Sequence, residues 1–475
     1  MNKTRQYQHC ALAAIFMTGA IAIPAAQAQR LTCNHDTITA SPGCTPAYFF
    51  QGGSDGGDPV GGVILGNGTN PPLYGTTNGG GVNEGTVYEL TPPAKSGGIW
   101  GYNLLYSFGT NAGDGANPQG PLVIDKNGAL YGMTSGSCGT VFQLTPPGSP
   151  GGIWTYNLLY TFTGGNDGCQ PWWSGLALDE NTGLFYGTTA YGGSTANNGY
   201  GWGTVFELAP PAAPGGAWTE SVLYSFTGGS DGGLPQASLL IGTKGGVAGK
   251  PLQELYGTAY SGGIAACGPA LTEGCGTVFE LKPQAKGKWK LSTLYSFKGG
   301  NDGGLSSAAL VIKGGVLYGT TSQEYSFYDN GGDCTWGCGT VFSLAPPVPP
   351  ASAWTETMLY HFQAPYAPPY STCPTEQCDA SIPVGGVVFG PNGALYGTTE
   401  AGGAFSTGTI FELAPPAAPG GAWTETVLYD TSFYAPTGGY TNFPTAPFAG
   451  LTVGKKGTVY GTSTGDAGMV FQLKP

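Results

Sequence analysis

The sequence predicts an all-β fold, a seven-bladed β-propeller built from four-stranded antiparallel blades. Three observations support this prediction. A Tyr-Gly pair followed by a Gly-(Thr/Met)-(Val/Ile)-(Tyr/Phe)-x-Leu segment occurs seven times in the 475-residue chain. Each repeat holds four runs of β-branched and aromatic residues, separated by glycine, proline or asparagine clusters. The two ends of the chain carry complementary parts of one repeat, which predicts a one-plus-three strand clasp between the N- and C-terminus.

The spacing of the repeats is that of propeller blades. Successive motif tyrosines lie 55 to 78 residues apart. Repeats of four strands and roughly 40 residues or more are typical of blades, because one such unit cannot bury its faces alone. The seven tyrosines are Tyr74, Tyr131, Tyr186, Tyr256, Tyr318, Tyr396 and Tyr460.

The third repeat illustrates the four strands. We expect them at residues 175–178, 184–189, 204–208 and 218–226. The glycine after each motif tyrosine is expected where neighbouring sheets approach too closely for a side chain. A tryptophan opens the fourth strand of six repeats, and we expect these side chains to wedge between blades. They are Trp100, Trp154, Trp218, Trp289, Trp354 and Trp423.

The two ends of the chain complete the seventh blade. The chain finishes on a third-strand sequence, residues 469–473, with no fourth strand after it. Residues 47–56 match residues 223–232, which end the fourth strand of the third repeat. The first strand is therefore expected to supply the missing fourth strand, which removes an exposed sheet edge.

The first 28 residues are predicted to be a secretory signal. Lys3 and Arg5 precede an apolar run, and a small-x-small cleavage site follows at residues 26–28. An N-terminal arm, residues 29–44, and a single propeller domain, residues 45–475, are expected to follow. The apolar run is too short to span a bilayer, and neither a transmembrane segment nor a C-terminal anchor is predicted. We expect an exported monomer, either periplasmic or extracellular.

Cysteine usage agrees with export. Ten cysteines remain after the signal is removed, and an even number in an oxidising compartment favours disulfides over metal binding. Eight of them form four local pairs in the sequence, although connectivity stays open: Cys33/Cys44, Cys267/Cys275, Cys334/Cys338 and Cys373/Cys378. Cys138 and Cys169 remain, and strand alternation places both in loops of the same propeller face.

The repeat motif resembles a known family. Leu-Tyr-Gly-Thr-Thr followed by Gly-Thr-Val-Phe-Glu-Leu is similar to the GloVer tandem repeat of exported bacterial proteins, over nearly the whole chain after the signal. It is more distantly similar to pyrroloquinoline-quinone-type propeller repeats. The resemblance implies a repeat protein outside the cytoplasm, often with a C-terminal anchor that this chain lacks. It implies no catalytic residues, and no cofactor is predicted.

Charge is distributed unevenly between the two faces of the predicted propeller. The formal net charge of −12 argues against nucleic acid and anionic membranes as partners. Most acids fall on what we call the upper face, formed by loops between second and third strands and between successive blades. Four of these acids recur in Gly-Gly-(Ser/Asn)-Asp-Gly: Asp55, Asp167, Asp231 and Asp302. Each suits a tight turn that needs a local hydrogen bond and a positive φ. The alternative is that they attract cations such as calcium, although no calcium-loop pattern is present.

Aromatic residues that break the repeat are the candidate ligand-binding residues. They lie in upper-face loops, where flat rings suit sugars or extended polymers, or alternatively fill the wider hairpins. The candidates are Trp172, Trp173, Tyr191, Tyr200, Trp202, Tyr325 and Trp336.

Three functions remain after these assignments. The first is a non-catalytic propeller that binds a glycan or an extracellular protein. The second is a polysaccharide hydrolase or lyase that uses loop carboxylates, although no pair stands out. The third is a structural cell-surface protein. A Ser-His-Asp site is disfavoured, because His361 occupies an ordinary strand position and His35 lies in the N-terminal arm.

Overall fold

The computed structural model describes residues 44–95, 97–149, 151–193, 199–213, 215–244, 252–263, 267, 273–322, 338–363, 380–403, 407–418, 420–431, 447–465 and 467–474. The predicted signal and all but the last residue of the predicted arm lie outside these ranges. So do two candidate binding residues, Tyr325 and Trp336, and four cysteines, Cys33, Cys334, Cys373 and Cys378.

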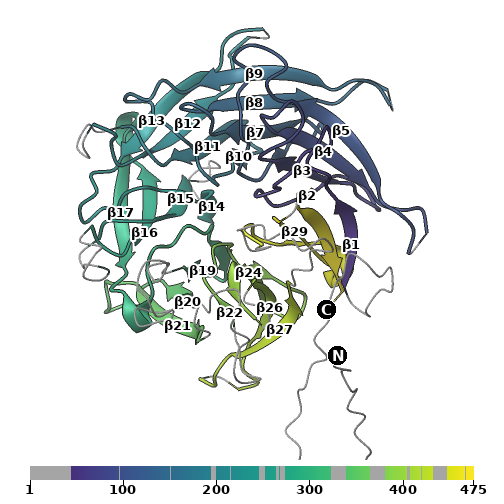
Figure 1. Ribbon diagram of the computed structural model, residues 1–475. Coiled ribbons are helices and arrows are strands. Elements are labelled where there is room, and N and C mark those ends of the chain that lie inside the picture. The colour runs from purple at the N-terminus through teal and green to yellow at the C-terminus, as the bar shows by residue number, and fades with distance from the viewer. Residues whose placement is uncertain are drawn as a thin grey trace, which may run out of the picture.

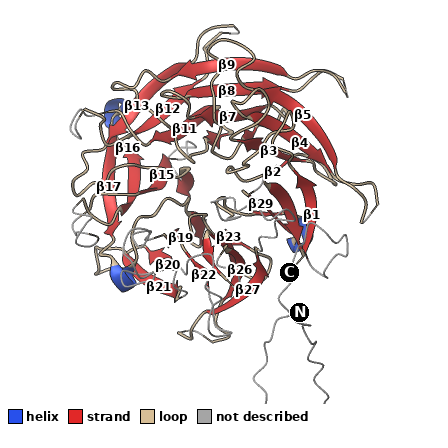
Figure 2. Cartoon of the chain, viewed as in Figure 1, coloured by secondary structure: helices blue, strands red, loops and turns tan. Residues whose placement is uncertain are grey.

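The chain forms a seven-bladed β-propeller of four-stranded antiparallel sheets, as predicted. The first strand of each blade lies nearest the centre and the fourth lies at the rim (Figures 1 and 2). Blade 1 holds β2 (Ile64–Leu65), β3 (Leu73–Thr77), β4 (Thr86–Thr91) and β5 (Gly101–Ser107); blade 2 holds β6 (Val123–Ile124), β7 (Leu130–Thr134), β8 (Thr140–Thr145) and β9 (Thr155–Thr161). Blade 3 holds β10 (Ala177–Asp179), β11 (Leu184–Thr189), β12 (Thr204–Ala209) and β13 (Thr219–Ser225); blade 4 holds β14 (Leu240–Lys244), β15 (Leu252–Ala259), β16 (Thr277–Pro283) and β17 (Trp289–Ser296).

The remaining blades repeat this order. Blade 5 holds β18 (Val311–Lys313), β19 (Val316–Thr321), β20 (Thr340–Ala345) and β21 (Thr355–His361); blade 6 holds β23 (Val388–Phe389), β24 (Leu395–Thr399), β26 (Thr409–Ala414) and β27 (Thr424–Asp430). Blade 7 holds β28 (Thr452–Val453), β29 (Val459–Ser463), β30 (Met469–Leu473) and β1 (Cys44–Phe49). A small sheet joins β22 (Ala380–Ser381) to β25 (Ala401–Gly402), and the described loops contain the 3-10 turns η2 (Ala285–Gly287), η3 (Gly300–Asp302) and η5 (Lys455–Gly457).

The clasp between the ends of the chain is confirmed. β1 pairs antiparallel with β30, so blade 7 has the strand order β1-β30-β29-β28. The purple first strand accordingly lies beside the yellow last strands in Figure 1. Phe50 is 4% exposed and packs at the seam between blades 7 and 1. The ring is therefore closed by hydrogen bonds as well as by packing.

The recurrent tryptophans pack between blades, as expected. Five of them meet the motif tyrosine of the preceding blade edge-to-face, with ring centroids 6.0 to 6.5 Å apart. The pairs are Trp100–Tyr460, Trp154–Tyr74, Trp218–Tyr131, Trp289–Tyr186 and Trp354–Tyr256. Trp423 packs in the same hydrophobic cluster as Tyr318. These contacts give six of the seven seams an apolar contact that needs no loop contribution.

Two sequence expectations about the blades need correction. The glycine after the motif tyrosine faces an aromatic ring of its own blade, because a Cβ at Gly187 would lie 2.5 Å from Phe206 Cζ on the adjacent strand β12. The innermost strand of blade 3 starts at Ala177 rather than at residue 175. A Cβ at Gly175 would lie 2.9 Å from the carbonyl oxygen of Pro121, so this part of the chain packs against blade 2 before pairing begins.

The disulfides support the assignment of loops to faces. Cys138–Cys169 links an internal loop of blade 2 to the segment that leaves that blade, and Cys267–Cys275 is also formed. Cys338 is disulfide-bonded as well. Backbone bridges join the same two classes of loop elsewhere, at Gly57/Gly79 and Gly233/Ser261. The described residues contain no helix long and apolar enough to cross a membrane.

Candidate ligand-binding site at the propeller axis

The recurrent aspartates of the upper face serve the turns between blades. Asp167 accepts hydrogen bonds from the Tyr160 hydroxyl at 3.1 Å and the Thr163 backbone N–H at 2.8 Å. Asp55, Asp231 and Asp302 accept the same two kinds of bond. The tight-turn interpretation is thus confirmed for the hydrogen bond, but the positive φ belongs to the following glycine, as at Gly168 with φ 102°.

No metal site follows from the acids of the described ranges. They contain no group of three or more histidine, cysteine, aspartate or glutamate residues arranged to hold a metal ion. The turn aspartates accept hydrogen bonds from the tyrosine hydroxyls of the preceding strands, so we assign them to the fold.

After each of these turns, one residue with a left-handed backbone conformation connects neighbouring blades through its hydrogen bonds. The Leu234 N–H donates to the Trp202 carbonyl of blade 3 at 2.8 Å, and the Leu234 carbonyl accepts from the Tyr260 N–H of blade 4 at 3.3 Å. Six residues hold this position with φ between 53° and 58°: Asp58, Asn117, Gln170, Leu234, Leu305 and Ile382. Because both backbone groups are bonded, the residues just after this position are held rigidly.

The residue two places after this position lines a cavity at the axis. One residue per blade contributes, and we call these seven residues the axial ring. They are, from blade 1 to blade 7, Val60, Gln119, Trp172, Gln236, Ser307, Val384 and Phe448. The cavity has a volume of about 530 Å³, which lies in the range of small-molecule sites.

The axial ring has two unlike sides. Blades 2 to 5 supply Gln119, Trp172, Gln236 and Ser307, which we call the polar arc. Blades 6, 7 and 1 supply Val384, Phe448 and Val60, which we call the aliphatic arc although it contains one phenyl ring. A symmetric scaffold therefore carries an asymmetric cavity.

Blade 3 departs from the repeat where it meets blade 2. At the other six seams a threonine hydroxyl of the second strand donates to a carbonyl of the next blade's inner segment, at 2.9 to 3.4 Å. At this seam Met133 replaces that threonine. Blade 3 also carries one extra residue, Trp173, whose φ of 49° is unusual for a bulky side chain. Both departures lie beside the polar arc.

The extra residue belongs to an aromatic cluster that lines the cavity. Trp172 lies 6.3 Å from Trp173 and 5.2 Å from Tyr191, measured between ring centroids. Tyr191 also lies 6.3 Å from Tyr200, which is 71% exposed. Trp172, Trp173 and Tyr191 all line the cavity, and Tyr200 extends the cluster outward.

The Cys138–Cys169 disulfide anchors this cluster. Cys169 exchanges two backbone hydrogen bonds with Tyr191, at 2.8 and 3.0 Å. The Gln170 N–H donates to the Cys138 carbonyl at 2.8 Å, and the Trp172 N–H donates to the Gln170 carbonyl at 2.8 Å. A rigid support of this kind keeps a binding surface in one geometry. Burial raises the pKa of the Tyr191 hydroxyl, which therefore stays protonated and able to donate.

Trp202 has a different environment from the other candidates. It packs against the hydrophobic cluster around Phe226 and does not belong to the cavity lining. A Cβ at Gly228 would lie 2.2 Å from its indole ring, so the ring covers the turn between blades 3 and 4. Of the seven predicted candidates, three therefore line the cavity, Tyr200 lies beside them, and Trp202 packs in the blade. The other two lie outside the described residues.

The cavity lining includes two amides and one carboxylate. Gln236 is 5% exposed, and its Oε1 has no hydrogen-bond partner among the described residues. The Gln119 Nε2 donates to Asn78 Oδ1 at 3.3 Å. Glu400 is 8% exposed and is the single carboxylate among the described lining residues. An orphaned amide oxygen in a cavity wall suits a ligand that donates a hydrogen bond.

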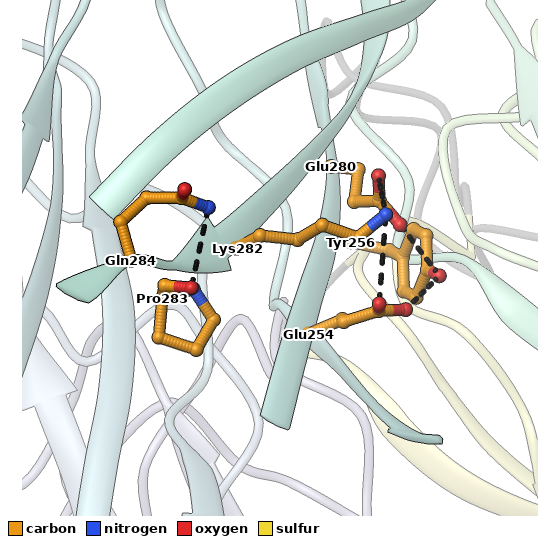
Figure 3. Close-up of polar contacts among 6 residues, drawn as sticks. All are labelled: Glu254, Tyr256, Glu280, Lys282, Pro283 and Gln284. Carbon is orange, nitrogen blue, oxygen red and sulfur yellow. Dashed lines mark hydrogen bonds and ion pairs between the residues drawn. The ribbon is translucent and has the colours of Figure 1, made fainter. Parts of the chain in front are cut away.

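A second cluster of titratable groups lies in blade 4, apart from the cavity lining (Figure 3). Lys282 Nζ lies 2.6 Å from Glu280 Oε2 and 3.5 Å from Glu254 Oε1, and the Tyr256 hydroxyl lies 2.8 Å from Glu254 Oε2 and 2.9 Å from Glu280 Oε1, so that its one proton is shared between the two carboxylates. Burial acts to lower the pKa of Lys282, but the hydrogen bond and charge of Glu280 outweigh it and raise the pKa. These groups satisfy one another, so we assign the cluster to the stability of the blade.

Sequence reasoning missed most of the axial ring. Gln119, Gln236, Ser307, Val384 and Phe448 stand in segments that look like ordinary turns. The signal that identifies them is variation inside the repeat. One position varies between the turn that recurs in each repeat and the apolar residue that leads into the inner strand. The seven repeats hold valine, glutamine, tryptophan, glutamine, serine, valine and phenylalanine there.

The fold and the axial ring define a seven-bladed propeller with an asymmetric cavity at its centre. The chain belongs to the Gloeobacter/Verrucomicrobia repeat family, whose model matches residues 37–271, 136–374 and 250–471. The resemblance seen in the repeat motif is thereby confirmed. A search of the curated proteins finds no match.

Solved structures give a distant likeness. Two structures of Trichoderma reesei Carbohydrate-Active Enzymes Family AA12, described as the calcium and the iodide structure, match with TM-scores of 0.40 and 0.39. Each is 12% identical; both alignments cover 93% of this chain, and 99% and 100% of the respective AA12 chains. Likeness at this level does not transfer an activity.

Proposed function

We propose that this protein binds a neutral carbohydrate in the axial cavity. The observation that carries the proposal is the convergence of Trp172, Trp173 and Tyr191 on the wall of that cavity. Aromatic rings offer flat apolar surfaces with polar edges, which match the C–H faces and hydroxyl rims of sugar rings. Because the disulfide and the backbone bonds fix these rings, little conformational entropy is lost on binding.

The amides beside the aromatic rings supply the polar contacts. The Gln236 oxygen is buried without a partner in the part of the chain that the structure describes, which costs about 1–3 kcal/mol for a typical group. A sugar hydroxyl that donates to this oxygen removes that cost. Gln119, on the opposite side of Trp172 in the ring, offers a second amide.

Binding is favoured over hydrolysis by the chemistry of the lining. Glycoside hydrolysis ordinarily needs two carboxyl groups that flank the scissile bond, about 5 to 10 Å apart. The described part of the cavity wall presents one, Glu400. We therefore retain a non-catalytic role, and export is supported by the disulfides of a chain with a predicted secretory signal.

A glycan array followed by calorimetry tests the proposal. The full chain is screened with and without calcium, and Trp172→Ala/Trp173→Ala is compared with the unchanged chain. We expect at least a tenfold loss of affinity for the best ligand, since aromatic contacts of this size contribute on the order of 1–3 kcal/mol.

Ile153→Ala provides the control, because Ile153 is 90% exposed and does not line the cavity. Its affinity should match that of the unchanged chain. Binding that survives the double tryptophan change, or turnover of a polysaccharide that Glu400→Gln abolishes, would contradict the proposal.

A further inference from the structure

We infer that the preferred ligand is a glycoside with an apolar aglycone, rather than a free sugar or a longer polar glycan. This inference rests on the proposed function and concerns the half of the cavity that faces the aromatic cluster. The sugar ring lies at the polar arc, and the aglycone lies against the aliphatic arc, Val384, Phe448 and Val60.

The apolar side of the cavity is also its deep side. In blades 6, 7 and 1 the lining follows five consecutive residues of the inner segment: 384–388, 448–452 and 60–64. The inner segments of blades 4 and 5 line it over four residues each, 234 with 236–238 and 307–309 with 311, and those of blades 2 and 3 over two each, Gln119 with Pro121 and Trp172 with Trp173. A ligand that fills the cavity must therefore place much of its surface against the inner strands of blades 6, 7 and 1.

Three backbone carbonyls of this deep side are already hydrogen-bonded. The carbonyls of Gly61, Gly385 and Ala449, each next to an axial-ring residue, already accept threonine hydroxyls of the preceding blade at 3.3, 3.1 and 2.9 Å. The side chains of these inner segments are valine, isoleucine, leucine, phenylalanine and alanine, with Thr452 Oγ1 already donating to the Val63 carbonyl. The single carboxylate of the described lining, Glu400, lies in the upper-face loop of blade 6, next to β24. The wall therefore presents mainly carbon atoms.

The cost of removing polar groups from water favours an apolar aglycone at this wall over a second sugar ring. A second sugar ring placed here would lose the hydration of several hydroxyl groups without new partners, which weakens binding. An alkyl or aryl group loses no hydrogen bonds, and the removal of its apolar surface from water strengthens binding. The two arcs together suit one polar ring joined to one apolar group.

The experiment measures matched glycosides by calorimetry. The probes are the methyl and phenyl glycosides of D-glucose, D-galactose, D-mannose and N-acetyl-D-glucosamine, each as both anomers. We expect at least one sugar to bind, with its phenyl glycoside about tenfold tighter than its methyl glycoside. A methyl glycoside or a linear tetrasaccharide that binds as tightly as the phenyl glycoside would overturn the inference while leaving the proposed function intact. Absence of binding by every probe would overturn both.

Val384→Thr tests the position of the aglycone. Threonine has nearly the shape of valine but adds a hydroxyl to the apolar wall. We expect the phenyl preference, the ratio of phenyl-glycoside to methyl-glycoside affinity, to fall from about tenfold to threefold or less. Phe448→Leu is a second variant in case Val384→Thr lowers the melting temperature. Val348→Thr, at a site 76% exposed and outside the cavity lining, is the matched control. An unchanged phenyl preference in both cavity variants would refute the placement.

Discussion

At the scale of single residues, Glu220 on β13 and Glu356 on β21 have raised pKa values, so their ionisation at neutral pH lowers the stability of the fold. Burial raises the pKa of Glu220 and of Glu356 from 4.5 to about 7. The carboxylates of Asp167 and Asp302 add to the rise, and Lys298 opposes it at Glu356. Between about pH 4.5 and 7 the folded chain thus holds protons that the unfolded chain releases. The stability of the fold therefore falls as pH rises through this window.

Replacing both glutamates should remove part of that pH dependence. We expect Glu220→Gln/Glu356→Gln to unfold at a higher urea concentration than the unchanged chain at pH 8, and at nearly the same one at pH 5. Because both side chains are partly exposed, solvent screening limits the gain to about 1 kcal/mol for each. Glu84→Gln, at an exposed loop residue, is the control. An equal shift at both pH values would contradict the assignment.

At the scale of the strands, the threonine hydroxyls couple each blade to the next. Thr398 is fully buried and donates to the Ala449 carbonyl at 2.9 Å. Thr398→Val keeps the shape of the side chain but leaves that carbonyl without the hydroxyl donor. We expect a loss of about 1–2 kcal/mol in the free energy of unfolding. Thr91→Val, at an exposed strand end, should change it little, and equal effects of the two would argue against this coupling role.

The strands were more predictable than the binding site, and the reason is the range of the interactions. β11 matches its predicted bounds because alternation and flanking turn residues act within a few positions. The axial ring brings together single residues from seven distant segments, and no local pattern marks Gln236 or Phe448 as neighbours. Trp202 and Trp172 are both unusual in the repeat, so the sequence predicts the same binding role for both. The packing of Trp202 around Gly228 shows that its role is structural.

At the scale of the whole molecule, the clasp should control solubility as well as stability. A chain that starts at residue 51 lacks β1, so the β30 edge is left unpaired and the buried Phe50 contact is lost. We expect the free energy of unfolding to fall by about 3 kcal/mol or more, with new oligomers formed through the free edge. Size-exclusion chromatography with light scattering, together with thermal unfolding, measures both. A truncated chain that stays monomeric with an unchanged melting temperature would contradict this role of the clasp.

The odd number of blades has a consequence for how a ligand is oriented. In a sevenfold ring no residue stands diametrically across from another, so Trp172 of blade 3 looks toward the boundary of blades 6 and 7. A flat molecule stacked on that indole directs its far edge between Val384 and Phe448 rather than onto either side chain. A substituent on that edge would lie between these two side chains, and its position on the sugar ring would decide which molecules fit.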